Sequence, residues 1–249
     1  MVDAPYKLLD GLVDAKAAGR PRFAVLIDPD RLRTTRLDEV VARSVDAGVD
    51  YFFIGGSLIV NNALDQVLSG IKETCDIPLV LFPGNSFQLS YRADALLFLS
   101  LISGRNPELL IGNHVISAPY LRISPLEIMP CGYMLVDGGT ATTVSYMSNT
   151  TPIPAEKSDI AVCTAVAGEM LGLKLMYLDA GSGARRPVPV EMIAAVSSAT
   201  TVPLIVGGGI RDPERARADV EAGADVIVVG NAIEGDPTLI AELASAVHG

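Results

Sequence analysis

The sequence predicts one (β/α)8 barrel, a TIM barrel, that spans residues 1–249 as a single domain. Three observations lead to this prediction. The length of 249 residues is typical of such a barrel. Eight short apolar runs follow one another, most of them separated by helical stretches. The last two runs each lead into glycines, and the loops after strands 7 and 8 are the usual phosphate site of this fold.

The eight runs have the length of strands, and their continuous apolarity is what parallel strands covered by helices require. In chain order they are residues 23–27, 51–54, 79–82, 96–99, 133–136, 175–178, 204–206 and 226–229. Helical periodicity fits residues 37–47, 155–171, 190–199 and 213–222. Asp212 and Pro213 are a typical N-cap and first-position pair for the last of these helices.

Two intervals lack a clear helix. After Leu81 only a short helix fits before residue 96, and residues 137–154 are too polar and too rich in proline for an immediate helix. Long loops on the catalytic rim of a barrel are usually functional. A doubly wound open sheet is the alternative fold, but it usually has a glycine fingerprint after its first strand. Here the first run ends in Asp28-Pro29-Asp30, and neither GxGxxG nor GxxxxGK[ST] occurs.

Composition limits the possible partners and the compartment. The chain has 19 Lys and Arg against 29 Asp and Glu, a net charge of −10, which argues against nucleic acid and acidic lipid as partners. Any phosphate site must therefore be local. The three cysteines are odd in number and lack metal-ligand spacing, which favours a reduced, cytoplasmic protein. The longest apolar run, 95–102, is too short to cross a bilayer, so we expect no integral membrane segment.

Two glycine turns near the end of the chain predict a phosphate site. Residues 207–209 follow the seventh run and carry no Cβ, so the backbone can come close to a ligand. Gly230 and Asn231 follow the eighth run and lead towards the last helix. Both turns can direct N–H groups at one anion. The alternative is that these glycines only make tight turns or close helix–strand packing.

Acidic and polar residues follow several other runs. On the barrel interpretation Asp28, residues 55–57, Asp137 and Asp179 converge at one mouth. Asp28 can bind Mg²⁺ through one carboxylate oxygen, with water and substrate phosphate completing the octahedron. Asp30 either shares this role or caps the next turn. Ser57 either donates its hydroxyl to the metal or a diphosphate, or caps a helix that begins near residue 58.

The segment 177–183 is the candidate catalytic strand end. Alternation puts Tyr177 and Asp179 on one face, and residues 181–183 form a donor-rich turn beside the glycines, where a polyol fits. Asp179 can bind a substrate hydroxyl and take its proton, or cap the next turn. Tyr177 is either part of this site or a core aromatic.

Other polar or apolar features are ambiguous. Arg185 and Arg186 either reach a second phosphate or form a solvated turn. We interpret His114 as a helix or loop residue that needs no catalytic role. The leucine-rich segment 96–112 mostly reflects packing of the fourth strand, and part of it can line an apolar channel.

Seven motifs together resemble the geranylgeranylglyceryl phosphate synthase family, which includes bacterial heptaprenyl relatives of the PcrB type. They are LIDPDR at 26–31, FFIGGS at 52–57, FPGNS at 82–86, SLISGRNPELLIGNH at 100–114, YLDAGSGA at 177–184, VGGGI at 206–210 and VGNAI at 229–233. The resemblance spans nearly the whole chain. The last two motifs occur in many phosphate-binding barrels, whereas YLDAGSGA and SLISGRNPELLIGNH are specific.

The resemblance implies a Mg²⁺-dependent prenyltransferase of lipid biosynthesis. It would join the C3 hydroxyl of sn-glycerol 1-phosphate to a long polyprenyl diphosphate, with geranylgeranyl as the expected chain, and form an ether-lipid precursor and diphosphate. The family's metal positions fall on Asp28 and Ser57. Its catalytic and glycerol-phosphate positions fall on Tyr177, Asp179, Ala180, Gly181, Ser182, Gly183, Gly208, Gly209, Gly230 and Asn231. The family often has glutamate where this chain has Asp179, which retracts the carboxylate by one methylene.

Two rival functions share the phosphate site. A sugar-phosphate isomerase or aldolase of the same fold needs a Schiff-base lysine or a strong base at the mouth, and the lysine nearest strand six, Lys174, precedes that strand. A non-catalytic barrel that senses a phosphorylated metabolite would bind phosphate without Mg²⁺ dependence. The apolar outer helices predict a homo-oligomer, while the prenyl chain length stays open.

Overall fold

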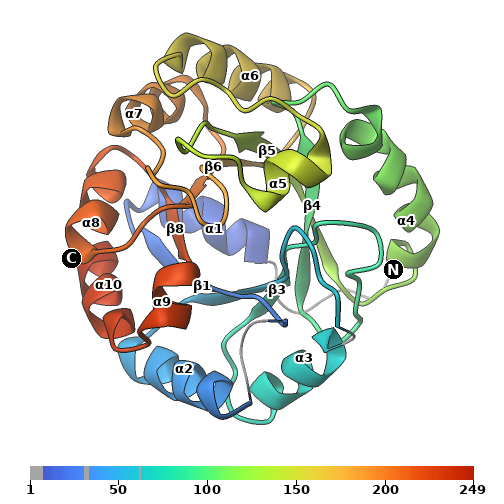
Figure 1. The fold of residues 1–249 in the computed structure, drawn as a ribbon, viewed down its shortest axis with the longest axis vertical. Helices are drawn as coiled ribbons and strands as arrows, with labels where there is room; N and C mark the ends of the chain where they lie inside the picture. Colours follow the sequence, from blue (N-terminus) through green and yellow to red (C-terminus); the bar gives the residue numbers. More distant parts are fainter. Residues whose placement is uncertain (1–7, 31–33, 62) are drawn as a thin grey trace.

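The computed structural model describes residues 8–30, 34–61 and 63–249, and it shows a closed barrel of eight parallel strands (Figure 1). Each strand pairs with its neighbour in chain order, and β8 closes the barrel against β1. The predicted (β/α)8 fold is therefore confirmed. The strands are β1 (Arg22–Ile27), β2 (Tyr51–Ile54), β3 (Leu79–Leu81), β4 (Ala95–Leu101), β5 (Glu127–Leu135), β6 (Leu175–Asp179), β7 (Leu204–Gly207) and β8 (Val226–Val229).

Most helices form a ring outside the strands, while α5 and α9 lie inside that ring, over the mouth of the barrel (Figure 1). Of the four helices predicted, the one over residues 190–199 has the predicted bounds, and the other three differ from theirs by a few residues. The helices are α1 (Leu8–Ala17), α2 (Thr34–Ala47), α3 (Leu64–Lys72), the π-helix η1 (Glu108–Gly112), α4 (Asn113–Leu121), α5 (Thr143–Ser148), α6 (Ser158–Met170), α7 (Val190–Ala199), α8 (Pro213–Glu221), α9 (Asn231–Gly235) and α10 (Leu239–His248).

The barrel has two apolar cores, one inside it and one between strands and helices. Leu8 and Leu12 of α1 belong to the inner core, so α1 closes the end of the barrel at which the strands begin. The amides of Leu8 and Leu9 donate to the Glu127 carboxylate at 2.6 and 3.0 Å, which fastens α1 to the start of β5. In the part of the chain that the structure describes, this leaves the end where the strands finish open for a ligand.

The structure corrects two expectations about loops. Residues 137–154 do contain a short helix, α5, because a capping box compensates for the polar sequence: the Thr142 side chain accepts from the Ser145 amide, and the Ser145 side chain accepts from the Thr142 amide. No helix begins near residue 58; α3 starts at Leu64, so Ser57 caps no helix.

Other local predictions are confirmed. Asp212 caps α8 by accepting from the Arg215 amide at 2.8 Å, with Pro213 in the first turn. By contrast, the short helix that fits the sequence after Leu81 does not form, because residues 82–94 contain no helix. Within the described ranges, no helix is both long and apolar enough to pass through a bilayer. Arg31, the end of the LIDPDR motif, lies outside the described residues.

Candidate functional site

The open end of the barrel holds two adjoining cavities with different linings. One, which we call the polar cavity, lies above β1 and β6–β8 and includes Asp28, Asp179, Gly208 and Gly230 among its lining residues. The other, the apolar channel, lies above β3–β5 and is lined largely by leucines and aromatic residues. Gly56, Ser57 and Phe82 line both. The predicted convergence of the first strand's carboxylate with the late glycine turns is thus observed.

The glycine turn after β7 lies unusually close to the end of β6. Gly208 and Gly209 have φ values of +80° and +75°, which side chains rarely allow. A Cβ on Gly208 would lie 2.4 Å from the Asp179 Oδ1 atom and 2.7 Å from the Gly181 nitrogen. Only glycine therefore fits between the two strand ends. Within the described ranges, no protein oxygen accepts a hydrogen bond from the Gly208 or Gly209 amide, so both can bind a ligand.

The other side of this cup comes from β8 and α9. Gly230 ends the strand, and the Asn231 amide opens the helix without an intrahelical partner. The Ser182 hydroxyl donates to the Asn231 side-chain oxygen at 2.9 Å, which joins the β6 and β8 loops. By contrast, the Ala180 amide donates to Gly207 and the Gly181 amide to Asp179, so these two predicted donors are already used within the protein.

Asp179 is buried among tyrosines. Its Oδ2 atom accepts from the Tyr133 hydroxyl at 2.5 Å, and its Oδ1 atom accepts from the Gly181 amide at 2.7 Å. Burial raises the pKa of Asp179, and these two hydrogen bonds oppose that shift. Phe82 stacks on Tyr177 with ring centroids 5.4 Å apart. A carboxylate with a raised pKa in a low-dielectric site is suited to accept a proton.

Asp28 lies at the end of β1 and faces the β2 loop. Its Oδ1 atom accepts from the Asp30 amide at 3.0 Å, and its Oδ2 atom lies 3.4 Å from where a Gly56 Cβ would be. No group of three or more His, Cys, Asp or Glu among the described residues forms a metal cage. Mg²⁺ commonly uses one or two carboxylates together with water and substrate phosphates, so Asp28 with neighbouring Ser57 fits this ion.

Asp30 and Gln88 hold the loops around Ser57. The Asp30 carboxylate accepts from the amides of Val60 and Asn61 at 2.5 and 3.1 Å. The buried Gln88 side chain accepts from Gly84 at 3.0 Å and donates to the Gly56 carbonyl at 2.9 Å. The loops after β1, β2 and β3 are therefore cross-linked, and Asp30 anchors the β2 loop.

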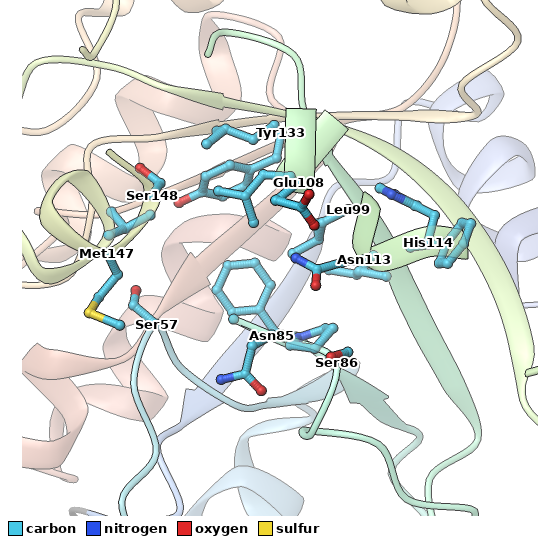
Figure 2. Close-up of a pocket in the computed structure, with 18 of the residues that line it drawn as sticks. Ser57, Asn85, Ser86, Leu99, Glu108, Asn113, His114, Tyr133, Met147 and Ser148 are labelled. Atoms are coloured by element: carbon cyan, nitrogen blue, oxygen red, sulfur yellow. The ribbon is translucent and has the colours of Figure 1, made fainter. Parts of the chain in front are cut away.

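The apolar channel extends away from this junction (Figure 2). Ser57, Met147 and Ser148 lie on one side of it, and His114 lies on the other. The His114 ring packs edge-on against Phe98 with centroids 4.3 Å apart, and burial lowers its pKa, so this side chain is neutral. Leu96, Leu97, Leu99 and Leu101 line the channel, so part of the leucine-rich segment does line a cavity, as predicted.

Three predicted positions lie outside both cavities. Asp137 accepts from the Gly139 amide at 2.8 Å and lies 3.8 Å from Arg186, so the expectation that it joins Asp28 and Asp179 is wrong. Arg185 and Arg186 are exposed. Strand alternation does not reach Asp137, because β5 ends at Leu135 and the Asp137 carboxylate binds within its own turn.

Three residues of the site were missed by sequence reasoning. Tyr133 pairs in register with Tyr177, and this pairing would have followed from aligning the two strands. Arg211 lines the polar cavity and donates to the Ala184 carbonyl at 2.8 Å; its place just after the GGGI turn was the available signal. Gln88 had no sequence signal, because its partners belong to another loop.

Comparison with known proteins gives consistent results. The sequence matches the PcrB family over residues 17–247. It is 57% identical over 242 residues to a Chitinophaga pinensis protein named geranylgeranylglyceryl phosphate synthase, covering 97% of this chain and 96% of that one. A protein of the same name from Thermococcus kodakarensis is 44% identical over 211 residues, which are 84% and 83% of the two chains.

A solved structure gives the same family likeness. The crystal structure of (S)-3-O-geranylgeranylglyceryl phosphate synthase from Thermoplasma acidophilum, in complex with its substrate sn-glycerol-1-phosphate, superposes with a TM-score of 0.91. The two sequences are 30% identical, and the match covers 98% of this chain and 99% of the other.

Proposed function

The chain belongs to the PcrB family, and on this premise we propose that it is a prenyltransferase that makes an ether-lipid precursor. The proposed reaction joins the C3 hydroxyl of sn-glycerol 1-phosphate to C1 of a polyprenyl diphosphate, with geranylgeranyl as the expected chain. The relatives' names and the complex of the Thermoplasma acidophilum enzyme support these substrates. The expected family resemblance is thereby confirmed.

One observation supports this function most strongly: a polar cavity and an apolar channel meet at Ser57 and Phe82. The polar cavity offers backbone amides from two glycine turns, which suit a phosphate dianion. The channel offers the leucine-lined walls that a polyprenyl tail needs. The bond-forming atoms of the two substrates would therefore meet between Asp179 and Asp28.

The chemistry follows from this placement. The amides of Gly208, Gly209 and Asn231 would hold the phosphate, and Tyr177 with Ser182 would orient the glycerol. Asp28 and Ser57 are proposed to hold Mg²⁺, which when bound would stabilise the negative charge of the diphosphate. As the C1–O bond to diphosphate breaks, the C3 oxygen bonds to C1, and Asp179 accepts the hydroxyl proton. The apolar walls exclude water from the allylic cation-like centre.

The two rival functions, a sugar-phosphate enzyme and a non-catalytic sensor, lack support at this site. Within the described residues no lysine lines either cavity, whereas a Schiff-base aldolase needs one. A phosphometabolite sensor would not need the adjoining apolar channel.

The three cysteines, Cys75, Cys131 and Cys163, are free thiols, which supports the proposed cytoplasmic location.

The product assay tests the function directly. The protein is incubated with labelled glycerol 1-phosphate, Mg²⁺ and a ladder of prenyl diphosphates, and product mass is read. We expect an ether product whose mass identifies the preferred chain, and none without Mg²⁺. Failure to form ether with every chain offered would refute the proposal.

Asp179→Asn tests the proposed base. The amide keeps the shape of the side chain but cannot accept a proton, so we expect kcat to fall about 100-fold. The KM for glycerol 1-phosphate should change little, because the glycine amides remain. Steady-state kinetics with both substrates check this split. A drop in affinity without a drop in kcat would make Asp179 a binding residue only.

Tyr133→Phe tests how the base is tuned. The hydroxyl hydrogen bond favours ionised Asp179, so its removal should raise the pKa of Asp179 further. The acidic limb of the kcat/KM profile should then move to higher pH, so activity on that limb should fall relative to wild type. Tyr120→Phe on exposed α4 serves as the control and should leave the profile unmoved.

We also propose that the protein is a homo-oligomer. Val115, Ile116 and Tyr120 of α4 are 65%, 57% and 62% exposed, and such large apolar patches commonly mark interfaces between subunits. Native mass spectrometry should show more than one chain. Ile116→Glu should shift the distribution towards monomer, and a monomeric wild type would refute this proposal.

A further inference from the structure

We infer that the side of the mouth around the apolar channel rests on the surface of a lipid bilayer, from which the polyprenyl substrate enters the channel. This inference rests on the proposed function, because it concerns how the tail of that substrate reaches its site. The proposed partner is the surface of a bilayer of zwitterionic lipids, which carries no net charge. Three features support this inference: exposed apolar side chains, the lack of charge in the three loop segments that carry them, and the hydrogen bonds that hold two of these loops.

Large apolar side chains project from three loops that surround the channel. Phe87, after β3, is 93% exposed, and Val60, after β2, is 76% exposed and lies where this loop borders both cavities. Tyr146, on α5 after β5, is 85% exposed. These loops all follow the carboxyl ends of strands, so they lie at one end of the barrel. Neighbouring residues of the same loops, such as Ser86 and Met147, line the channel itself. The apolar rim is thus continuous with the tail site.

The three loop segments that carry these side chains are also uncharged, and the exposed charges on this side of the mouth, Arg105 and Glu108, belong to the segment after β4. Residues 55–64, 82–91 and 138–155 contain no Asp, Glu, Lys or Arg, although these four types make up 19% of the chain. A surface without charges loses little hydration energy when it approaches an apolar phase. The other half of the mouth differs, because Arg185, Arg186 and Arg211 are exposed there. The molecule can therefore tilt its channel side onto the bilayer while the polar cavity stays open to water.

Side-chain hydrogen bonds hold the backbone of two of these loops, those that carry Phe87 and Val60. Gln88, next to Phe87, is only 5% exposed and bridges the β2 and β3 loops through Gly84 and Gly56. The Asp30 carboxylate fixes the backbone of Val60. A rigid apolar rim loses little conformational entropy on insertion, and interfacial binding strengthens with the apolar area that is buried. Polyprenyl chains themselves partition into bilayers, so a channel mouth placed there shortens their path.

A single tryptophan tests this inference. The chain contains none, so Phe87→Trp introduces the only indole, on a residue that lines neither cavity. With phosphatidylcholine vesicles, its emission should shift to the blue and be quenched by lipids brominated in their acyl chains. The control is Leu171→Trp, because Leu171 is 81% exposed at the opposite end of the barrel, where α6 leads into β6. Its emission should not change.

Phe87→Ser gives a second readout. Vesicle flotation should show binding weakened about tenfold relative to wild type, as expected for losing one inserted phenyl ring. The KM for polyprenyl diphosphate presented in vesicles should rise, while kcat with substrate in detergent micelles should stay unchanged. Vesicles rich in anionic lipid should bind the protein more weakly, because its net charge is −10.

The outcomes separate this inference from the proposed function. Suppose that ether product forms. If vesicles then leave the emission of Phe87→Trp unchanged, or change the emission of Leu171→Trp equally, the bilayer inference is wrong and the enzyme assignment stands. If Phe87→Ser changes the sedimenting mass and leaves vesicle binding unaltered, the rim contacts a second copy of the chain, which also overturns it. Vesicle insertion without any ether product would support the rim and refute the proposed reaction.

Discussion

Replacing Asp28 with alanine is expected to lower kcat/KM for polyprenyl diphosphate by about 10⁴-fold, because the proposed metal site loses its carboxylate. Asp28 lies at the end of β1, beside Gly56 and the junction of the two cavities. The serine hydroxyl of Ser57 is neutral and cannot replace that charge. Raising the Mg²⁺ concentration should not restore turnover. Glycerol 1-phosphate should still bind, since the glycine amides are unaltered.

The matched control is Asp38→Ala, which removes the same charge from an exposed position on α2 and should leave kinetics unchanged. Magnesium titrations of both variants under steady-state conditions, with calorimetry of glycerol 1-phosphate binding, separate the two substrates. Near-normal turnover of Asp28→Ala in saturating Mg²⁺ would show that the metal is bound elsewhere.

Gly208→Ala should have the second largest effect, lowering the affinity for glycerol 1-phosphate by about 10³-fold. The added methyl would lie 2.4 Å from the Asp179 carboxylate, which is closer than carbon and oxygen can approach. The residue also has a φ of +80°, which alanine resists. Either the turn after β7 or the end of β6 must move, so the phosphate amides and the proposed base are displaced together.

Gly235→Ala is the control for this prediction, because that glycine lies in α9 near the same cavity and a methyl group there meets no atom within 4 Å. Calorimetry gives the affinities, and circular dichroism confirms that both variants fold. Wild-type affinity in folded Gly208→Ala would exclude the turn after β7 from the phosphate site.

The strands were predictable where burial is continuous. Tyr51–Ile54 and Val226–Val229 match their apolar runs, because residues buried on both faces leave no polar interruptions. Strand β5 begins six residues before its predicted start, at Glu127, because Glu127 binds the α1 amides and Pro130 is accommodated within the sheet. Short helix α5 depends on a capping box that hydrophobic periodicity does not register.

The site was predictable where residues directly follow a strand. Asp28, Asp179 and Gly208 were brought together by the geometry of the barrel alone, since all its strands end at the same mouth. Asp137 did not follow this rule, because its carboxylate binds the Gly139 amide of its own turn and lies 3.8 Å from Arg186. Tyr133 and Gln88 act through neighbouring strands or loops, and that information exists only once register is known.

Simultaneous occupancy of the two cavities tests the account most directly. The protein is saturated with Mg²⁺ and an unreactive polyprenyl thiodiphosphate, and sn-glycerol 1-phosphate is titrated by calorimetry. We predict one glycerol phosphate per chain, with an affinity within about tenfold of that of the protein without the prenyl analogue. Mutually exclusive binding would contradict the division of the mouth into a phosphate cup and a tail channel.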